Sequence, residues 1–209
     1  MTTYFITGIG TNVGKTVISA IIAEALHADY WKPVQAGFES GTDSELVRSL
    51  LTNSNSVVHP EIYKLKMAAS PHIAAEEEGM EISIEKIVNE KPVTDHTMII
   101  EGPGGLLVPL NKDQFTLDLI KELNTTVIIV SRNCLGSINH SLLTARVLMQ
   151  NKINVLGWIF NDDYLDYEGE IVDWSGFPWI ASVRNLPEIN KSVIHAQSVK
   201  IKEHLNIFL

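Results

Sequence analysis

A glycine-rich turn between an apolar strand and an apolar helix is the feature that most restricts the fold of this chain. Residues 7–16 read Thr-Gly-Ile-Gly-Thr-Asn-Val-Gly-Lys-Thr and join a strand-like run to a helical pattern. Glycines let successive backbone N–H groups point at phosphate oxygens, and the helix start adds the positive end of its dipole. Lys15 can then reach the β- and γ-phosphates, and Thr16 offers a hydroxyl to Mg²⁺. The sequence therefore predicts a phosphate-binding loop.

The loop departs from the usual pattern G-x-x-x-x-G-K-[ST], because Ile9 stands where the first glycine belongs and Gly8 lies one residue earlier. The alternative interpretation is an ordinary strand-to-helix turn with a chance Gly-Lys-Thr. The order of strand, loop and helix is the one that a phosphate site requires, so it favours the first interpretation.

Short apolar runs alternate with helical patterns along the rest of the chain. Strands buried on both faces are expected at 4–7, 30–34, 97–101, 126–130, 155–160 and 179–183. Helices are expected near 15–27, 43–52, 115–124, 138–151 and 192–204, while the stretch 53–91 is the least clear and includes a helix-compatible segment at 67–78. This alternation predicts an α/β fold, with one P-loop domain over 1–209 and a mostly parallel central sheet covered by helices on both faces.

Composition restricts the partners that the chain can have. A formal net charge of −9 and the lack of a Lys/Arg run argue against nucleic-acid binding, which needs a basic surface. The longest apolar stretches are far shorter than the roughly 20 residues that span a bilayer, so no membrane association is expected. Cys134 is the only cysteine, which rules out an intrachain disulfide and makes a cytoplasmic enzyme the expectation.

Polar residues follow three of the expected strands, at the sheet edge where ligands of α/β proteins bind. Lys32 closes the second strand, Glu101 precedes the run Gly-Pro-Gly-Gly, and Asn161 and Asp162 follow a later apolar run. Glu101 suits the acidic residue that helps to hold Mg²⁺ beside a P-loop. Taken singly, Glu101 could equally be a solvated strand end and Lys32 a surface lysine.

Asp43 has two interpretations of the same kind. It follows Thr42, and Thr42 with Glu45 forms the sequence pattern of a capping box at a helix start. Asp43 is therefore either a ligand of the site or a negative charge that stabilises the helix N-terminus.

Blocks spread over most of the chain together resemble the dethiobiotin synthetases, ATP-dependent enzymes that close the ureido ring in biotin synthesis. In family order, the matching blocks are 8–16, Lys-Pro-Val at 32–34, Thr-Asp-Ser at 42–44, Ser-Pro-His at 70–72, 101–105, 135–140 and 157–162. Each block is short, but their combination is specific.

The resemblance implies the substrates 7,8-diaminononanoate, CO₂ or bicarbonate, and ATP, with Mg²⁺ as cofactor. One amine captures CO₂ as a carbamate, ATP phosphorylates the carbamate to a carbamic-phosphoric anhydride, and the second amine closes the ring with loss of phosphate. Because the reacting groups are anionic, positioning and charge neutralisation should dominate catalysis.

The resemblance also implies roles for individual residues. Lys15 and Lys32 would be catalytic, and Thr16, Asp43 and Glu101 would bind the metal. The positions implied in ATP binding are Asn12, Val13, Gly14, Lys15, Thr16, Val17, Asp43, Glu101, Gly102, Pro103, Gly104, Asn161, Asp162, Ser182, Val183 and Arg184. The positions implied in substrate binding are Lys32, Ala36 and, from the neighbouring subunit of a homodimer, Gly136, Ser137, Ile138 and Asn139.

Two positions depart from the family pattern. Asn12 replaces an acidic residue that is often present in the loop, which puts the role of that carboxylate in doubt. Ala36 stands where members carry Ser or Thr near the carbamate, so one hydroxyl contact is absent. Our hypothesis is that Gln35 or Ser40 compensates for it.

Two other functional classes compete with this interpretation. One is a P-loop switch ATPase of the partitioning or metallochaperone kind, which would act through nucleotide-controlled dimerisation. Many of those proteins carry an additional lysine early in the loop, and residues 8–13 contain none. The other is a different amide-forming P-loop ligase that acts on a larger acid. Release of ADP that needs both the diamine and bicarbonate would separate these alternatives.

Overall fold

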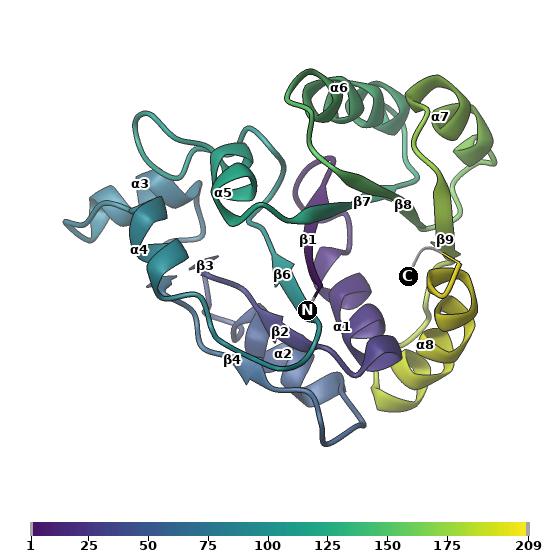
Figure 1. The fold of residues 1–209 in the computed structure, drawn as a ribbon, viewed down its shortest axis with the longest axis horizontal. Helices are drawn as coiled ribbons and strands as arrows, with labels where there is room; N and C mark the ends of the chain where they lie inside the picture. The colour runs from purple at the N-terminus through teal and green to yellow at the C-terminus, as the bar shows by residue number, and fades with distance from the viewer. Residues whose placement is uncertain (1, 208–209) are drawn as a thin grey trace.

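A seven-stranded sheet runs through the centre of the computed structural model, which describes residues 2–207 (Figure 1). The predicted domain 1–209 also includes Met1, Phe208 and Leu209, which lie outside the described residues. In spatial order the strands are β4 (Val58–His59), β2 (Asp29–Trp31), β6 (Met98–Glu101), β1 (Thr3–Gly8), β7 (Thr126–Arg132), β8 (Val155–Asn161) and β9 (Trp179–Val183). Every neighbouring pair is parallel, which confirms the predicted α/β class.

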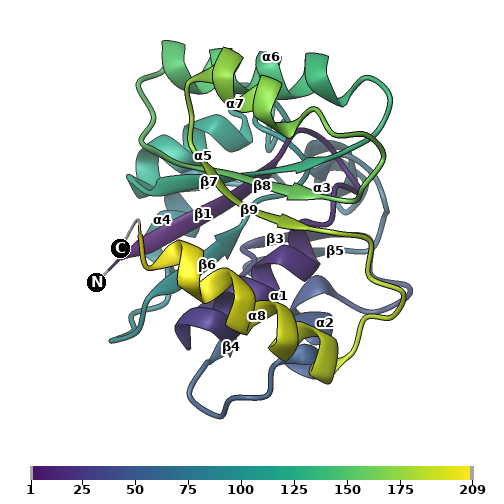
Figure 2. The same cartoon turned by 90° about the vertical axis from the view of Figure 1, so that its right-hand side faces the viewer.

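Helices cover both faces of the sheet, as predicted (Figure 2). One face carries α1 (Lys15–Leu26), α2 (Asp43–Leu50) and α8 (Lys191–Leu205). The other carries α4 (Ile84–Asn89), α5 (Thr116–Leu123), α6 (Ser137–Gln150) and α7 (Glu168–Ser175). Successive side chains of β1 point to opposite faces of the sheet. Phe5 packs against the α4–α7 side, and Ile6 packs against the side of α1, α2 and α8. Among residues 2–207, no helix has the length and apolar character needed to cross a membrane.

The strand that the sequence predicts at 30–34 is two strands in two sheets. β2 ends at Trp31, and β3 (Val34–Ala36) pairs instead with β5 (Tyr63–Leu65) in a separate two-stranded sheet. Pro33 explains the break, because a proline has no N–H to donate to a strand ladder. Lys32 therefore lies between the two sheets rather than inside a strand.

The unclear stretch 53–91 contains short elements that the sequence patterns only partly reveal. The helix-compatible segment 67–78 is confined to α3 (Pro71–Glu77), which begins at Pro71 because proline is tolerated at the first helical position. The sequence interpretation misses α4, α7, β4 and β5. It is correct about the capping box at Thr42, whose hydroxyl accepts from Glu45 N.

A buried carboxylate joins three of the helices on the P-loop side. Glu24 of α1 accepts hydrogen bonds from Thr52 N at 2.9 Å and Asn53 Nδ2 at 2.8 Å, just beyond α2. His195 Nδ1 of α8 lies 3.3 Å from the same carboxylate. Burial alone would raise the pKa of Glu24, but the hydrogen bonds from Thr52 and Asn53 lower it from 4.5 to about 2. The charged form of Glu24 therefore stabilises the fold.

We expect Glu24→Gln to lower the free energy of unfolding at pH 7 by about 1–3 kcal/mol. The glutamine amide has only one oxygen, so its N–H₂ group would face donors that the carboxylate now accepts from. Since the folded-state pKa lies below the unfolded-state value of 4.5, the wild-type advantage exists above pH 4.5 and disappears as the pH falls toward about 2. Urea unfolding at a series of pH values measures both effects. The exposed Glu122→Gln change is the control, and equal losses in the two variants would contradict the prediction.

Candidate active site

The phosphate-binding loop links β1 to α1 at the carboxyl edge of the sheet. Gly14 caps α1 with a φ of 92°, and Asn12 has a φ of 58°, so two residues of the loop adopt the left-handed conformation. Glycine adopts this conformation without steric cost and asparagine tolerates it better than most residues. The loop therefore folds back over the start of α1, where amide groups have no intrahelical partner.

Asn161, at the end of β8, fixes this loop from the side. Its Nδ2 donates to Val13 O at 3.0 Å. A Cβ atom on Gly14 would collide with the same Nδ2. Gly14 is thus required both for its backbone angle and for the close approach of Asn161.

Lys15 is a buried cation whose hydrogen-bond acceptor is a neutral backbone group. Only 7 % of the residue is exposed, and Nζ donates to Gly10 O at 3.0 Å. Burial lowers the pKa of Lys15 from 10.5 to about 8, although Glu101 and Asp43 partly oppose this effect. The ammonium still predominates at neutral pH, and an anion beside it would be stabilised. This is the electrostatic arrangement expected of a phosphate site.

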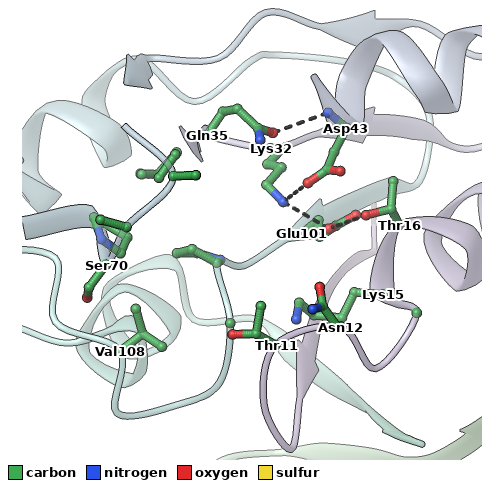
Figure 3. A pocket seen from close by; sticks show the side chains of 18 of the residues that line it. Thr11, Asn12, Lys15, Thr16, Lys32, Gln35, Asp43, Ser70, Glu101 and Val108 are labelled. Carbon is green, nitrogen blue, oxygen red and sulfur yellow. Dashed lines mark hydrogen bonds and ion pairs between the residues drawn. The ribbon is translucent and has the colours of Figure 1, made fainter. Parts of the chain in front are cut away.

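Lys32, in contrast, pairs with two carboxylates (Figure 3). Its Nζ lies 3.0 Å from Glu101 Oε1 and forms a second ion pair with Asp43 Oδ2. Thr16 Oγ1 donates to the same Glu101 oxygen at 2.9 Å, and the buried Tyr30 donates its OH to the other one at 2.9 Å. Burial would lower the pKa of Lys32, but the charges of Glu101 and Asp43 raise it above 10.5.

A cavity of about 730 Å³ connects the loop with the Lys32 cluster. Its lining includes Thr11, Asn12, Gly14, Lys15, Thr16, Val17, Lys32, Asp43, Glu101, Pro103 and Gly104 near the charged groups. The far wall is apolar apart from Gln35 and Ser70, and consists of Val34, Ala36, Ala68, Ala69, Pro71 and Val108. One end thus suits a polyanion, and the other suits a largely aliphatic molecule.

The oxygen atoms of Thr16, Asp43 and Glu101 fit a hard divalent cation such as Mg²⁺, which prefers hydroxyl, carboxylate and phosphate oxygens. Glu101 and Asp43 already share a cation, the Lys32 ammonium, and Thr16 contacts Glu101. Within residues 2–207 no group of three or more His, Cys, Asp or Glu side chains could hold a metal. The metal site of this cavity would therefore need oxygen atoms from a ligand.

Comparisons with known proteins identify the family. Residues 2–193 match a protein-family model described as an AAA domain. The chain is 47 % identical to the ATP-dependent dethiobiotin synthetase BioD of Cytophaga hutchinsonii, over 96 % of this chain and 97 % of the relative. The chain belongs to the dethiobiotin synthetase family. It is also 42 % identical to the dethiobiotin synthetase of Christiangramia forsetii, over 97 % of each chain.

Solved structures with the same fold come from proteins of much lower identity. The cell division ATPase MinD of Pyrococcus furiosus aligns with a TM-score of 0.66 and 14 % identity over 100 % of both chains. A plasmid partition protein of Borrelia burgdorferi aligns with a TM-score of 0.62 and 13 % identity, over 100 % of this chain and 99 % of that one. These similarities establish a shared fold, whereas the sequence identity to dethiobiotin synthetases establishes the family.

Several positions that the family resemblance assigns to ATP lie outside the cavity lining. Val13 is buried in the core, and Gly102 packs its backbone against the ring of Phe5. Asn161 reaches the loop through Val13 O, as described above. Asp162, at a φ of 76°, pairs with Arg132 at 2.9 Å. Their contacts with a nucleotide remain predictions.

The positions at the end of β9 have structural partners of their own. Ser182 donates its hydroxyl to Glu168 and accepts from Trp179 Nε1 at 2.9 Å. Val183 is buried, and its carbonyl accepts from Asp162 N at 3.0 Å. Arg184 is exposed. A contact between this segment and ATP therefore stays a prediction, and the hydroxyl of Ser182 is already used in holding β9 to α7.

The segment 136–139 forms the start of α6, with Gly136 as the capping residue at a φ of 91°. Ser137 is only 1 % exposed, and its hydroxyl bonds to Tyr167 OH at 2.6 Å. Its side chain thus holds the turn from inside and is not presented at the surface. Asn139 is exposed and is the polar side chain that this turn offers to a neighbouring molecule.

Our hypothesis offers Gln35 or Ser40 in place of the missing hydroxyl at Ala36, and the structure places Gln35 in the cavity lining but not Ser40. Gln35 Nε2 donates to Gly37 O at 2.7 Å, and its Oε1 accepts from Asp43 N at 3.2 Å. Both ends of the amide are therefore used to hold the loop that leads to Asp43. Ser40 is exposed and does not line the cavity.

Two contributors to the site were missed in the sequence. Tyr30 hydrogen-bonds to Glu101. Its position two residues before Lys32 was a signal, because residues two apart in an extended chain point to the same face. Ala68 and Ala69 line the cavity from the unclear stretch, just ahead of the Ser-Pro-His block, and an alanine gives no chemical signal in the sequence.

We expect Gly14→Ala to destabilise the fold by about 1–3 kcal/mol more than Gly136→Ala. Both glycines have nearly the same positive φ, 92° and 91°, so both substitutions carry the same backbone cost. Only Gly14 also lies against Asn161, since a Cβ on Gly136 would meet nothing within 4 Å. Urea unfolding of the two variants measures the difference, and equal losses would show that the Asn161 contact does not constrain the loop.

Proposed function

We propose that this chain is an ATP- and Mg²⁺-dependent dethiobiotin synthetase that closes the ureido ring of dethiobiotin from 7,8-diaminononanoate and CO₂. The observation that carries the proposal is the single cavity that joins a phosphate-binding loop, two carboxylates and a buried lysine to an apolar wall. Membership in the family supplies the identity of the substrates. The whole activity is assigned to one domain over residues 1–209, and we assign the enzyme to the cytoplasm, where ATP is available.

The charged end of the cavity suits the phosphoryl transfer. The loop amides and Lys15 bind the ATP phosphates. Thr16, Asp43 and Glu101 would hold Mg²⁺, whose charge would offset the negative charge of the phosphates. The carbamate oxygen attacks the γ-phosphorus and ADP leaves. Lys15 and Lys32 stabilise the negative charge that is spread over the transferring group.

The apolar end of the cavity suits the carbon chain of the diamine. Ala36, Val34 and Val108 present alkyl groups there, so burial of methylene groups contributes to binding. This wall holds the second amine near the carbonyl carbon of the anhydride. Attack by that amine forms the new C–N bond, releases phosphate and gives up a proton, which closes the ring.

We expect the purified chain to release ADP and form dethiobiotin only when the diamine, bicarbonate, ATP and Mg²⁺ are all present. Coupled ADP release and mass spectrometry of the product measure this. ATP hydrolysis that is unaffected by the diamine would instead support a switch ATPase.

We expect Lys15→Ala to lower kcat by about 100-fold or more, because it removes a charge that acts on the transferring phosphoryl group. The melting temperature should fall little or not at all, since burial already disfavours the Lys15 charge in the fold. The exposed Lys121→Ala change is the control and should keep full activity. A Lys15→Ala enzyme that retains most of the wild-type kcat would exclude the proposed site.

A homodimer with shared active sites forms the second part of the proposal. The turn 134–139 carries Leu135, which is 88 % exposed, and the exposed Asn139. The first turn of a long helix such as α6 presents free N–H groups and a positive dipole end, which suits a carboxylate. We infer that this turn binds the carboxylate of the diamine held in the cavity of the neighbouring subunit.

We expect Asn139→Asp to raise KM for the diamine far more than KM for ATP, because the new charge repels the substrate carboxylate. Mixing this variant with Lys15→Ala should restore about one quarter of the wild-type activity at low diamine concentration, since half of the randomly mixed dimers carry one intact site. Mixing Lys15→Ala with Lys32→Ala is the control and should restore nothing. No recovery from verified mixed dimers would refute the shared site, and a fully active monomer would refute the dimer.

A further inference from the structure

Lys32 occupies the position between the two carboxylates that a metal ion would share. Its Nζ lies 3.0 Å from Glu101 Oε1 and pairs directly with Asp43, and Thr16 Oγ1 meets the same Glu101 oxygen at 2.9 Å. An ammonium and a divalent cation cannot share this space, because like charges repel strongly at contact distance. Lys32 and the metal therefore compete for the same oxygen atoms.

The positive and negative charges of the side chains that line the cavity are equal in number when no ligand is bound. Its lining contains two lysines, Lys15 and Lys32, and two carboxylates, Asp43 and Glu101. A divalent cation that entered alone would leave this buried cluster with excess positive charge. A cation that arrives together with a polyphosphate brings its own anion, so the balance is kept.

The two lysines differ in a way that singles out Lys32. Lys15 Nζ donates to the carbonyl oxygen of Gly10, whereas Lys32 Nζ donates to a carboxylate oxygen of Glu101. Figure 3 shows the Lys32 ammonium between Asp43 and Glu101, at one side of the cavity. The backbone of Lys32 is fixed between β2 and Pro33, whereas its side chain is long and lies beside open space within the cavity.

We propose that Lys32 is a place-holder for the metal. Its ammonium prevents divalent cations from binding to Asp43 and Glu101 until a metal–nucleotide complex binds, and the Lys32 side chain then moves toward the reacting carbamate. This inference rests on the metal site of the proposed function. It means that metal binding and the positioning of Lys32 are one coupled event. The free enzyme would then bind a metal–nucleotide complex in preference to the metal and nucleotide taken one after the other.

Binding of Mn²⁺ to the nucleotide-free protein, followed by electron paramagnetic resonance, tests this proposal. Lys32→Met should lower the Kd for Mn²⁺ by about tenfold or more, because the carboxylate pair loses its resident cation. Lys15→Met removes the same charge from the same cavity and should change the Kd by no more than about threefold. Lys32→Arg, which keeps the charge, should bind Mn²⁺ as weakly as the wild type does.

Two further measurements complete the test. Adding Glu101→Gln to Lys32→Met should return Mn²⁺ affinity to the wild-type level, which would place the metal on the carboxylates. Thermal melting checks that each variant folds, and Lys32→Gln replaces Lys32→Met in the comparison if the latter does not. A Lys32→Met or Lys32→Gln protein that binds Mn²⁺ no more tightly than Lys15→Met would overturn the place-holder role.

Failure of this inference can be told apart from failure of the proposed function. If Glu101→Gln in the otherwise native chain binds Mn²⁺–ATP as well as the wild type, the metal site of the proposed function is wrongly assigned, and the place-holder role fails with it. If that variant loses affinity for Mn²⁺–ATP while removal of the Lys32 charge gives no gain in Mn²⁺ binding, only the place-holder role is excluded.

Discussion

Glu101 ends the inner strand β6 with a carboxylate that is 1 % exposed, and three side chains from different elements donate to it. Thr16 comes from α1, Tyr30 from β2 and Lys32 from the break after β2. A buried carboxylate is stable only when such partners compensate for its lost hydration. The positions of these elements at the sheet edge therefore depend on the charge of Glu101, and the glycine-rich loop and the apolar wall of the cavity meet around it.

The overall architecture could be predicted because its signals are strong and local. The glycine-rich loop between an apolar strand and helix allows few folds, and consecutive apolar residues in the strands indicate a parallel sheet. The prediction failed where a single residue overrides the pattern, as at Pro33, which ends one strand and places the next in another sheet. It also failed for the short elements α4 and α7, whose stability comes from packing against the rest of the domain.

The residue types of the candidate site could be predicted from the sequence, but the contacts that hold these residues could not. Lys15, Thr16, Asp43 and Glu101 have chemical types that a phosphate and metal site needs, and the structure brings all four to one cavity. The hydrogen bonds that hold them were not predictable, because Tyr30, Gln35 and Asn161 meet their partners only in the folded chain. Ser137, which the family resemblance assigns to the substrate, has its hydroxyl bonded to the buried Tyr167, so its contact with the substrate stays a prediction.

The break at Pro33 also divides the cavity between two separate scaffolds. The charged end is built on the large sheet, whereas much of the apolar wall comes from β3, the segment after β5 and the start of α3. These parts pack together as a small unit, with Gly37 close against Ala68. With this modular arrangement, substitutions could change the shape of the apolar wall while the charged end of the cavity keeps its geometry.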